Sequence, residues 1–253
     1  QPIRRALSAT EPVRYLACPA CHQRMNRKNF GGTSGIIADL CREHGTWFNR
    51  GELRYEQGDF NGAVQDYSQA LRIAPKDAAA YNSRGHAYYR LGGIREAMRD
   101  YDQAVRLNPR DAAILTNRGD AHAFQGNYAL AAQDFREAIR LDNQLGRAYQ
   151  SAAWLMATCP DQRFRSPQLG LDSAKKAIEL DGDEDFRYLE TLAAAYANAG
   201  QFEEARQTQA QALEKAPEQD LARFKRRLDL YSANRPYRES GNVTQAPRQI
   251  RSR

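Results

Sequence analysis

The chain has 253 residues, of which 42% are hydrophobic and 27% charged. No apolar run reaches the roughly 18 residues of a membrane-spanning helix, which excludes an integral membrane protein and predicts one large or two modest globular domains. The formal net charge is +6, with basic ends and an acidic middle. This asymmetry suggests that a terminus contacts phosphate, a membrane surface or an acidic partner, although a solvated basic end would look the same.

After an N-terminal extension over residues 1–14, the front of the chain carries a metal-ligand pattern. The spacing C-x2-C-x19-C-x2-H is formed by Cys18, Cys21, Cys41 and His44. Each short knuckle brings two side chains within reach of one ion, and structural Zn²⁺ takes four such donors at tetrahedral corners. This predicts a structural zinc site in residues 15–45, with a disulfide, free thiols or a redox CxxC pair as the alternatives.

The segment between the knuckles predicts a β-hairpin, because a turn at Gly31 and Gly32 precedes the β-branched pair Ile36 and Ile37. So short a domain buries little apolar surface, and zinc can supply an apparent free energy of about 10–16 kcal/mol. The stretch YLACPACHQRMNRKNFGGTSGIIADLCREHGTWFNRGEL resembles the small zinc ribbon of transcription factor IIB. The family has cysteine where this chain has His44, which is an ordinary zinc donor.

A repeat of 34 residues follows, with ungapped copies starting at Thr46, Ala80 and Ile114. Small and apolar residues at helical spacing predict two short amphipathic helices in each copy. Glycine stands at each turn between the helices, and proline follows the second helix in several copies. The turn glycines of the three copies are Gly58, Gly92 and Gly126.

This pattern resembles the tetratricopeptide repeat. It implies an all-α fold: a helical-hairpin solenoid forming a right-handed superhelix, with the β zinc ribbon as a rigid N-terminal cap because GTWFNRGEL belongs to both motifs. Five copies are expected in residues 46–219, at about 44–77, 78–111, 112–145, 146–185 and 186–219. The fourth carries six extra residues, about five of them in CPDQRFRSPQLG, which predicts a loop that stands out from the solenoid.

Residues 220–233 predict a capping helix with a polar outer surface. Its expected buried face is Leu221, Phe224, Leu228 and Tyr231, and its expected outer residues are Arg223, Arg226 and Arg227. Residues 234–253 predict a basic polar tail without a core of its own, which would need a partner to be ordered. The phrases ATCPD, ETLAAAYANAGQFEEA and RPYRE resemble the C-terminal part of a group of bacterial tetratricopeptide proteins.

The resemblance also implies a groove lined by the first helix of each repeat, which takes up a peptide or a partner helix. By register the inward positions are Phe48, Glu52, Tyr55, Glu56, Asn82, His86, Tyr89, Arg90, Thr116, Asp120 and Phe124, with Glu190 and Ala194 in the last copy. Their mixed charge and aromatic content favour a protein ligand. Packing within the stack is the alternative for the three aromatic residues Tyr55, Tyr89 and Phe124. Phe48, Glu52 and Ala113 stand where a carboxylate clamp would need donors, which argues against chaperone tails.

The sequence predicts no catalytic centre, because His86 and His122 stand apart from any cysteine or serine arrangement. The acidic turn DGDED resembles the start of a calcium loop, but Phe186 and Leu192 replace its glycine and closing glutamate, so a helix-capping turn is expected. Together these features predict a non-catalytic scaffold or adaptor, a component of a multi-subunit complex in the cytoplasm, where thiolate ligands persist.

Two other functions stay open. The first is nucleic-acid binding by the basic ribbon, through Arg14, Arg24, Arg27, Lys28 and Arg42, with Phe30 placed to stack on a base. The second is an accessory role in a longer enzyme, because the sequence begins at Gln1 rather than methionine.

Overall fold

The computed structural model describes residues 26–30, 36–40 and 47–240, and divides the chain into two compact units between Lys76 and Asp77. In the first unit, β1 (Asn26–Phe30) pairs antiparallel with β2 (Ile36–Leu40). The hairpin expected between the two knuckles is therefore present. Helices α1 (Trp47–Glu56) and α2 (Phe60–Ile73) follow it.

Most of the residues assigned to the zinc ribbon and its nucleic-acid surface cannot be placed in this fold. The four predicted zinc ligands and the basic residues Arg14, Arg24 and Arg42 lie outside the described residues. Arg27, Lys28 and Phe30 lie on β1, whose backbone alone is described. Zinc binding and the rigid N-terminal cap stay predictions.

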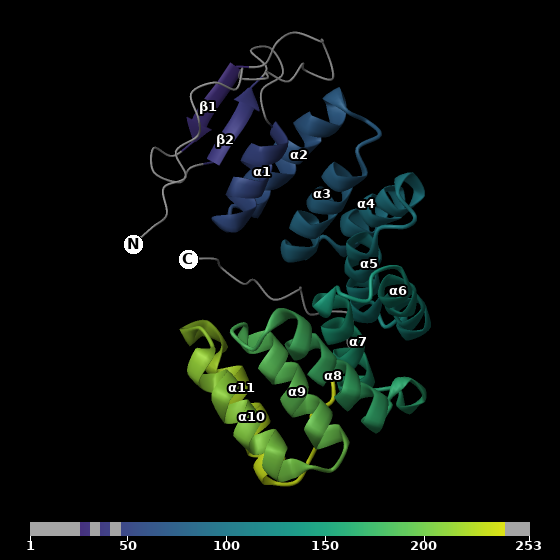
Figure 1. The fold of residues 1–253 in the computed structure, drawn as a ribbon, viewed down its shortest axis with the longest axis vertical. Helices are drawn as coiled ribbons and strands as arrows, with labels where there is room; N and C mark the ends of the chain where they lie inside the picture. Colours follow the sequence, from purple (N-terminus) through teal and green to yellow (C-terminus); the bar gives the residue numbers. More distant parts are fainter. Residues whose placement is uncertain (1–25, 31–35, 41–46, 241–253) are drawn as a thin grey trace, which may run out of the picture. The chain divides into compact units, whose positions relative to one another are not determined.

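The second unit is a stack of helical hairpins in which α3 packs on α4, α5 on α6, α7 on α8 and α9 on α10, with α11 against α10 (Figure 1). Their bounds are α3 (Ala78–Arg90), α4 (Ile94–Leu107), α5 (Ala112–Phe124), α6 (Tyr128–Leu141), α7 (Gly146–Thr158), α8 (Pro167–Asp181), α9 (Phe186–Asn198), α10 (Phe202–Lys215) and α11 (Leu221–Ser232). These bounds follow the predicted repeats, so the helical-hairpin fold is confirmed.

Glycine permits the tight turn inside the regular hairpins. Gly92 and Gly126 have φ of 83° and 82°, in the left-handed region that side chains with a Cβ avoid, and Gly58 has φ of 80°. Aspartate begins several first helices, as at Asp111, whose carboxylate accepts from the backbone N–H groups of Ala113 and Ile114. The expected glycine turns are confirmed.

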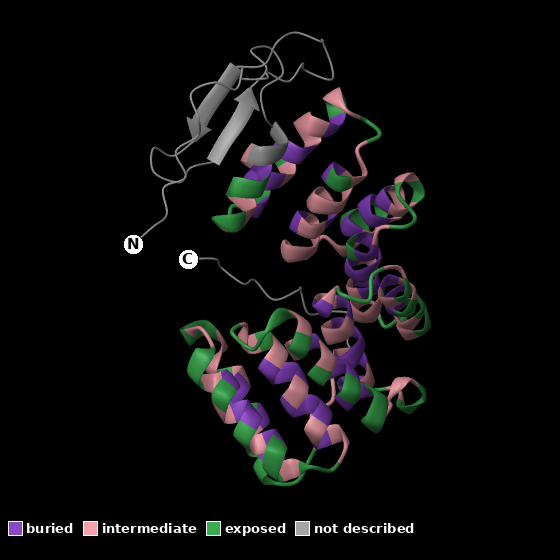
Figure 2. Cartoon of the chain, in the orientation of Figure 1, coloured by how far each residue is buried: buried purple, intermediate pink, exposed green. Residues whose placement is uncertain are grey.

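Small residues bring the two helices of a hairpin together. A Cβ added to Gly85 would lie 3.1 Å from the Tyr101 ring and 3.2 Å from the carbonyl of Ala97. Ala97 and Tyr101 are both fully buried. The buried positions follow the faces where helices meet (Figure 2), and this packing holds helices that are too short to be stable alone in water.

The fourth repeat departs from this plan, as its extra residues predict. Between α7 and α8 the chain forms the short 3-10 helix η1 (Gln162–Phe164). Gln162 and Arg163 are exposed, but the ring of Phe164 packs 6.0 Å from that of Tyr128 on α6. The loop therefore projects at its tip and is anchored at its base.

The capping helix α11 is present where expected, and Phe224 and Tyr231 are fully buried. The prediction that Arg227 faces outward is wrong, because its side chain is among the most buried in the described chain, with the residue 1% exposed. A buried guanidinium is tolerated only where an opposite charge and packing partners replace its hydration. Its partners come from three other segments, described below.

Candidate functional site

Two of the predicted inward positions of α3, Asn82 and Tyr89, contact helix α5. The amide nitrogen of Asn117 donates to Oδ1 of Asn82 over 2.9 Å. The rings of Tyr89 and Phe124 meet edge to face with their centroids 5.9 Å apart, and both remain half-buried. These aromatic residues therefore pack on each other while keeping part of their surface exposed.

Charged groups extend this face to α7. Nη2 of Arg147 donates to Oδ2 of Asp120 over 2.8 Å, with the side chains 41% and 25% exposed. Burial raises the pKa of Asp120, and the Arg147 charge opposes that shift. The sequence interpretation assigned no inward position in the fourth copy, where the inserted residues break the register, and so it missed Arg147.

His86 on α3 has a lowered pKa because of its burial and of the arginines around it. Burial lowers its pKa to about 3, helped by the charges of Arg147, Arg90 and Arg187. The imidazole is therefore neutral at pH 7 and can donate one hydrogen bond and accept another.

Thr116 does not belong to the exposed groove to which the register assigned it. The residue is 1% exposed, and its hydroxyl donates to the carbonyl of Ala112 over 2.8 Å. A short β-branched side chain bonded to its own helix stays within the packed layer.

In the first unit, Glu52 and Glu56 are exposed on α1. Partial shielding from water, and then the neighbouring Glu56 carboxylate, raise the pKa of Glu52. Tyr55 is half-buried and packs edge to face on Phe60, with centroids 5.1 Å apart. The side chain of Phe48 lies outside the described residues.

A second periodic feature holds each of the first three hairpins together. An arginine on the first helix reaches an aspartate on the second, and the pairs recur every 34 residues: Arg50 with Asp66, Arg84 with Asp100, and Arg118 with Asp134. In the second pair the two bonds measure 2.7 and 2.8 Å, a bidentate geometry. The sequence interpretation missed these pairs, although the shared offset of both residue types was the signal for them.

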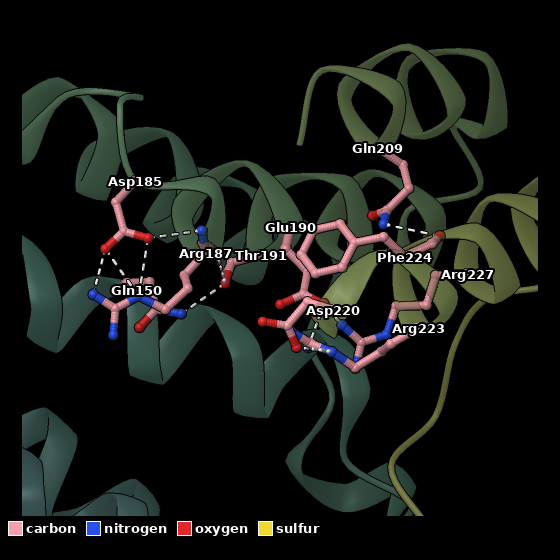
Figure 3. Close-up of polar contacts among 10 residues, drawn as sticks. All are labelled: Gln150, Asp185, Arg187, Glu190, Thr191, Gln209, Asp220, Arg223, Phe224 and Arg227. Atoms are coloured by element: carbon pink, nitrogen blue, oxygen red, sulfur yellow. Dashed lines mark hydrogen bonds and ion pairs between the residues drawn. The ribbon is translucent and has the colours of Figure 1, made fainter. Parts of the chain in front are cut away.

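Arg227 lies at the centre of a buried cluster in the last two repeats. It forms an ion pair with Glu190, which Arg223 also contacts at 2.6 Å (Figure 3). Its guanidinium carbon lies 4.8 Å from the Trp154 ring and 4.1 Å from the Tyr237 ring. The flat cation thus exchanges water for a carboxylate and two aromatic rings.

Residues 237–239, here named the clasp, continue this cluster along the end of α7. Nη1 of Arg238 donates to the carbonyl of Ala157 over 2.8 Å, and Nη2 to Oδ1 of Asn198 over 2.9 Å. The backbone N–H of Glu239 donates to the carbonyl of Thr158 over 2.8 Å. The start of the predicted tail is therefore held by the chain itself, and residues 241–253 lie outside the described part.

The clasp occupies inward positions. Trp154, Ala157 and Thr158 stand two repeats of 34 residues after His86, Tyr89 and Arg90, and Asn198 follows Arg90 by three repeats plus the six inserted residues. The phrases ATCPD, ETLAAAYANAGQFEEA and RPYRE, far apart in the sequence, meet here. In the last two repeats, the chain's own C-terminal segment thus lies on the face that the first helices present.

Among the residues that the structure describes, no three histidine, cysteine, aspartate or glutamate side chains are placed to hold a metal ion. Asp185 caps the N-terminus of α9, as expected for the acidic turn, by accepting from the N–H of Arg187. Across 26–30, 36–40 and 47–240, no helix has the length and apolar character to cross a bilayer.

Comparison with known proteins identifies the repeat. Profiles described as "TPR repeat" and "Tetratricopeptide repeat" match residues 51–92, and residues 82–145 and 186–219, respectively. A search of curated protein sequences gave no match.

Three solved structures illustrate the likeness in fold. The thermophilic TPR protein TTC0263 of Thermus thermophilus is 19% identical with a TM-score of 0.60, over 74% of this chain and 98% of its own. MamA of Desulfovibrio magneticus RS-1 is 18% identical with a TM-score of 0.53, over 70% and 96%. The APC/C hetero-tetramer Cut9-Hcn1 gives 17% and 0.66, over 74% of this chain and 36% of that chain. At these identities the likeness establishes the fold alone.

Proposed function

We propose that this chain, which is a tetratricopeptide-repeat protein, acts as a non-catalytic scaffold or adaptor whose inward helix positions bind an extended segment of a partner protein. One observation carries the proposal: the clasp, which belongs to no helix or strand, already lies on the inward positions of α7 and α9, held through Ala157, Thr158 and Asn198. The corresponding positions of α3 and α5 carry the half-open rings of Tyr89 and Phe124.

The chemistry of this face suits a polypeptide. Aromatic rings supply apolar contact area, while Asn82, Arg90 and Arg147 supply donors for backbone carbonyls and carboxylates. A partner held in this way would be one subunit of a larger assembly that the repeats organise.

Site-specific photo-crosslinking tests this proposal. A benzoylphenylalanine placed at position 89 or 124 should link the chain to the same partner protein in cells of its source. The same group at Leu130, which is 48% exposed on α6, is the matched control and should give no such product. Equal yields from all three positions, or no protein product from 89 and 124, would refute binding at this face.

We also propose that Cys18, Cys21, Cys41 and His44 hold a structural Zn²⁺. Support comes from their spacing and from the β1–β2 hairpin that lies between the two pairs. Such a thiolate site suits a reducing compartment such as the cytoplasm.

Elemental analysis tests the zinc site. The purified chain should contain about one zinc per molecule, and Cys18→Ser or Cys41→Ser should lose it. Cys159→Ser is the control and should retain zinc, because Cys159 is buried at the end of α7. A wild-type chain that is folded but free of zinc would exclude the ribbon.

A further inference from the structure

We propose that the ends of α7 and α9 form a binding site for an extended segment in which arginine follows an aromatic residue, and that the clasp is its intramolecular ligand. The inference rests on the proposed use of the inward helix positions for partner binding. It adds a ligand chemistry and a location, and it divides the face into a half that the chain fills itself and a half that it leaves to a partner.

The first argument comes from the backbone of α7. The last carbonyls of an α-helix lack partners within the helix. In α3, α5 and α9 the glycine turn supplies them, as where the N–H groups of Gly92 and Gly93 donate to the carbonyls of Tyr89 and Tyr88. Helix α7 has no such glycine turn. It ends at Cys159, with φ of −53° and ψ of 130°, and the chain then enters the inserted loop.

The N–H of Ser166, in the inserted loop, donates to the carbonyl of Met156, and the clasp supplies donors for the two carbonyls that follow it. Arg238 donates to the carbonyl of Ala157, and the N–H of Glu239 donates to that of Thr158. The side-chain donor is cationic and sits at the negative end of the helix dipole. An arginine followed by a backbone N–H can come from this chain or from a partner protein. The site would therefore bind either segment, because it recognises these donors and not the chain that carries them.

The second argument is that residues outside the clasp hold the receiving cation in place. Glu190 holds Arg227, and Arg227 lies beside the ring of Trp154. An aromatic residue before the arginine then adds a second ring over the same cation, as Tyr237 does with its centroid 6.0 Å from that of Trp154. Aromatic followed by arginine is therefore the sequence that this surface selects.

The clasp also explains why the site would be silent in the intact chain. Helix α11 ends at Ser232, so only four residues separate it from Tyr237. A tether this short gives an effective concentration on the order of millimolar. A free peptide that makes the same contacts cannot compete at micromolar concentration, whereas a partner that also engages α3 and α5 can.

The test uses the full chain and a labelled peptide of residues 233–240, ANRPYRES. Fluorescence anisotropy should detect no binding to wild type at micromolar peptide. The double variant Tyr237→Ala/Arg238→Ala, which releases the site, should bind the peptide saturably. A peptide with alanine in place of its second arginine should bind at least about tenfold more weakly, because that arginine makes two charge-assisted bonds, to Ala157 and Asn198. Arg235→Ala is the matched control, because Arg235 is exposed, and should behave as wild type.

Two outcomes would overturn the proposal. One is a double variant with wild-type circular dichroism and melting temperature that does not bind the peptide, or that binds the altered peptide equally well. The other is a double variant whose last two repeats unfold, which would make residues 237–239 a fixed part of the fold. Crosslinking at positions 89 and 124 is read separately, so failure of this site leaves the scaffold proposal standing.

Discussion

The regular hairpins α3–α4 and α5–α6 differ from the later hairpins α7–α8 and α9–α10 in what joins their helices. In the regular pair, a glycine lies under an aromatic ring, as Gly119 does under Phe135. The last repeat has Ala193 and Gln209 at the same positions, and the amide of Gln209 donates to the carbonyl of Phe224 on α11. The ring of Phe135 thus fills a hairpin in the middle of the stack, whereas Gln209, at the same position of the last repeat, bonds to the capping helix α11.

The ion pairs differ in the same way. The Arg84–Asp100 pair and its counterparts connect the two helices of one hairpin and recur with the repeat. In the last hairpin the pairing residue is gone, and Thr208 stands at the position of Asp100. The Arg227–Glu190 pair instead connects α11 to α9 and stacks on α7 through Trp154. The middle repeats are thus held locally, while the last repeats depend on contacts between distant segments.

The largest expected effect breaks the distant contacts. Arg227→Ala removes a buried cation from Glu190, Trp154 and Tyr237, and should lower the free energy of unfolding by about 3 kcal/mol. Urea denaturation followed by circular dichroism measures this loss. Arg226→Ala, at an exposed position of the same helix, is the control and should change stability by less than about 0.5 kcal/mol. Similar values for the two variants would contradict the burial of Arg227.

The next effect tests the local pairs. Asp100→Ala leaves Arg84 without its bidentate partner and should lower the free energy of unfolding by about 2 kcal/mol. Hydrogen bonds to charged groups contribute more to stability than hydrogen bonds between neutral groups. Thr208→Ala at the corresponding position of the last repeat should cost about 1 kcal/mol or less. Equal costs in the same urea titration would mean that the ion pair adds nothing to the hairpin.

The two regions also differ in how much the sequence revealed. Periodicity predicted the helices, turns and small residues of every hairpin, because each depends on neighbours within one repeat. It failed for Arg227, since an amphipathic pattern assigns arginine to water and the compensating Glu190 lies on another helix. The sequence predicts residues 234–253 as a tail that needs a partner to be ordered. It misses the contacts of the clasp within the chain because two of them go to backbone carbonyls, which no side-chain pattern records. The inserted residues after α7, which remove the glycine turn, were the only local signal.

A smaller effect tests the packing of the regular hairpins. In Gly119→Ala the new Cβ would lie 2.6 Å from Cε1 of Phe135, a buried ring that has little room to move. Overpacking should cost about 1–3 kcal/mol. Gly85→Ala brings its Cβ only to 3.1 Å from Tyr101 and should cost less. Thermal unfolding of both variants ranks the two losses of stability. A larger loss for Gly85→Ala would show that the distances in the folded structure do not decide how well each hairpin accommodates the added methyl group.

The smallest effect separates the two regions by pH. The pKa of His86 is about 3 in the folded chain and about 6.5 when unfolded. Between these values the unfolded chain binds a proton that the folded chain does not, so stability falls as pH drops below 6.5. The charges of Arg147 on α7, Arg90 on α3 and Arg187 on α9 also oppose protonation of His86.

Because His86 is only half-buried, we expect wild type to lose about 1 kcal/mol more than His86→Gln between pH 7 and pH 5, measured by urea denaturation. Identical losses in the two chains would mean that the ring is protonated in the fold and that the inward face of α3 is less positive than its arginines suggest. The Arg227 guanidinium stays protonated between pH 7 and pH 5. Its charge therefore adds no pH dependence to the loss of stability that Arg227→Ala causes. The comparison therefore predicts that the contribution of His86 to stability changes between pH 7 and pH 5, while the Arg227 cation that holds α11 keeps its charge.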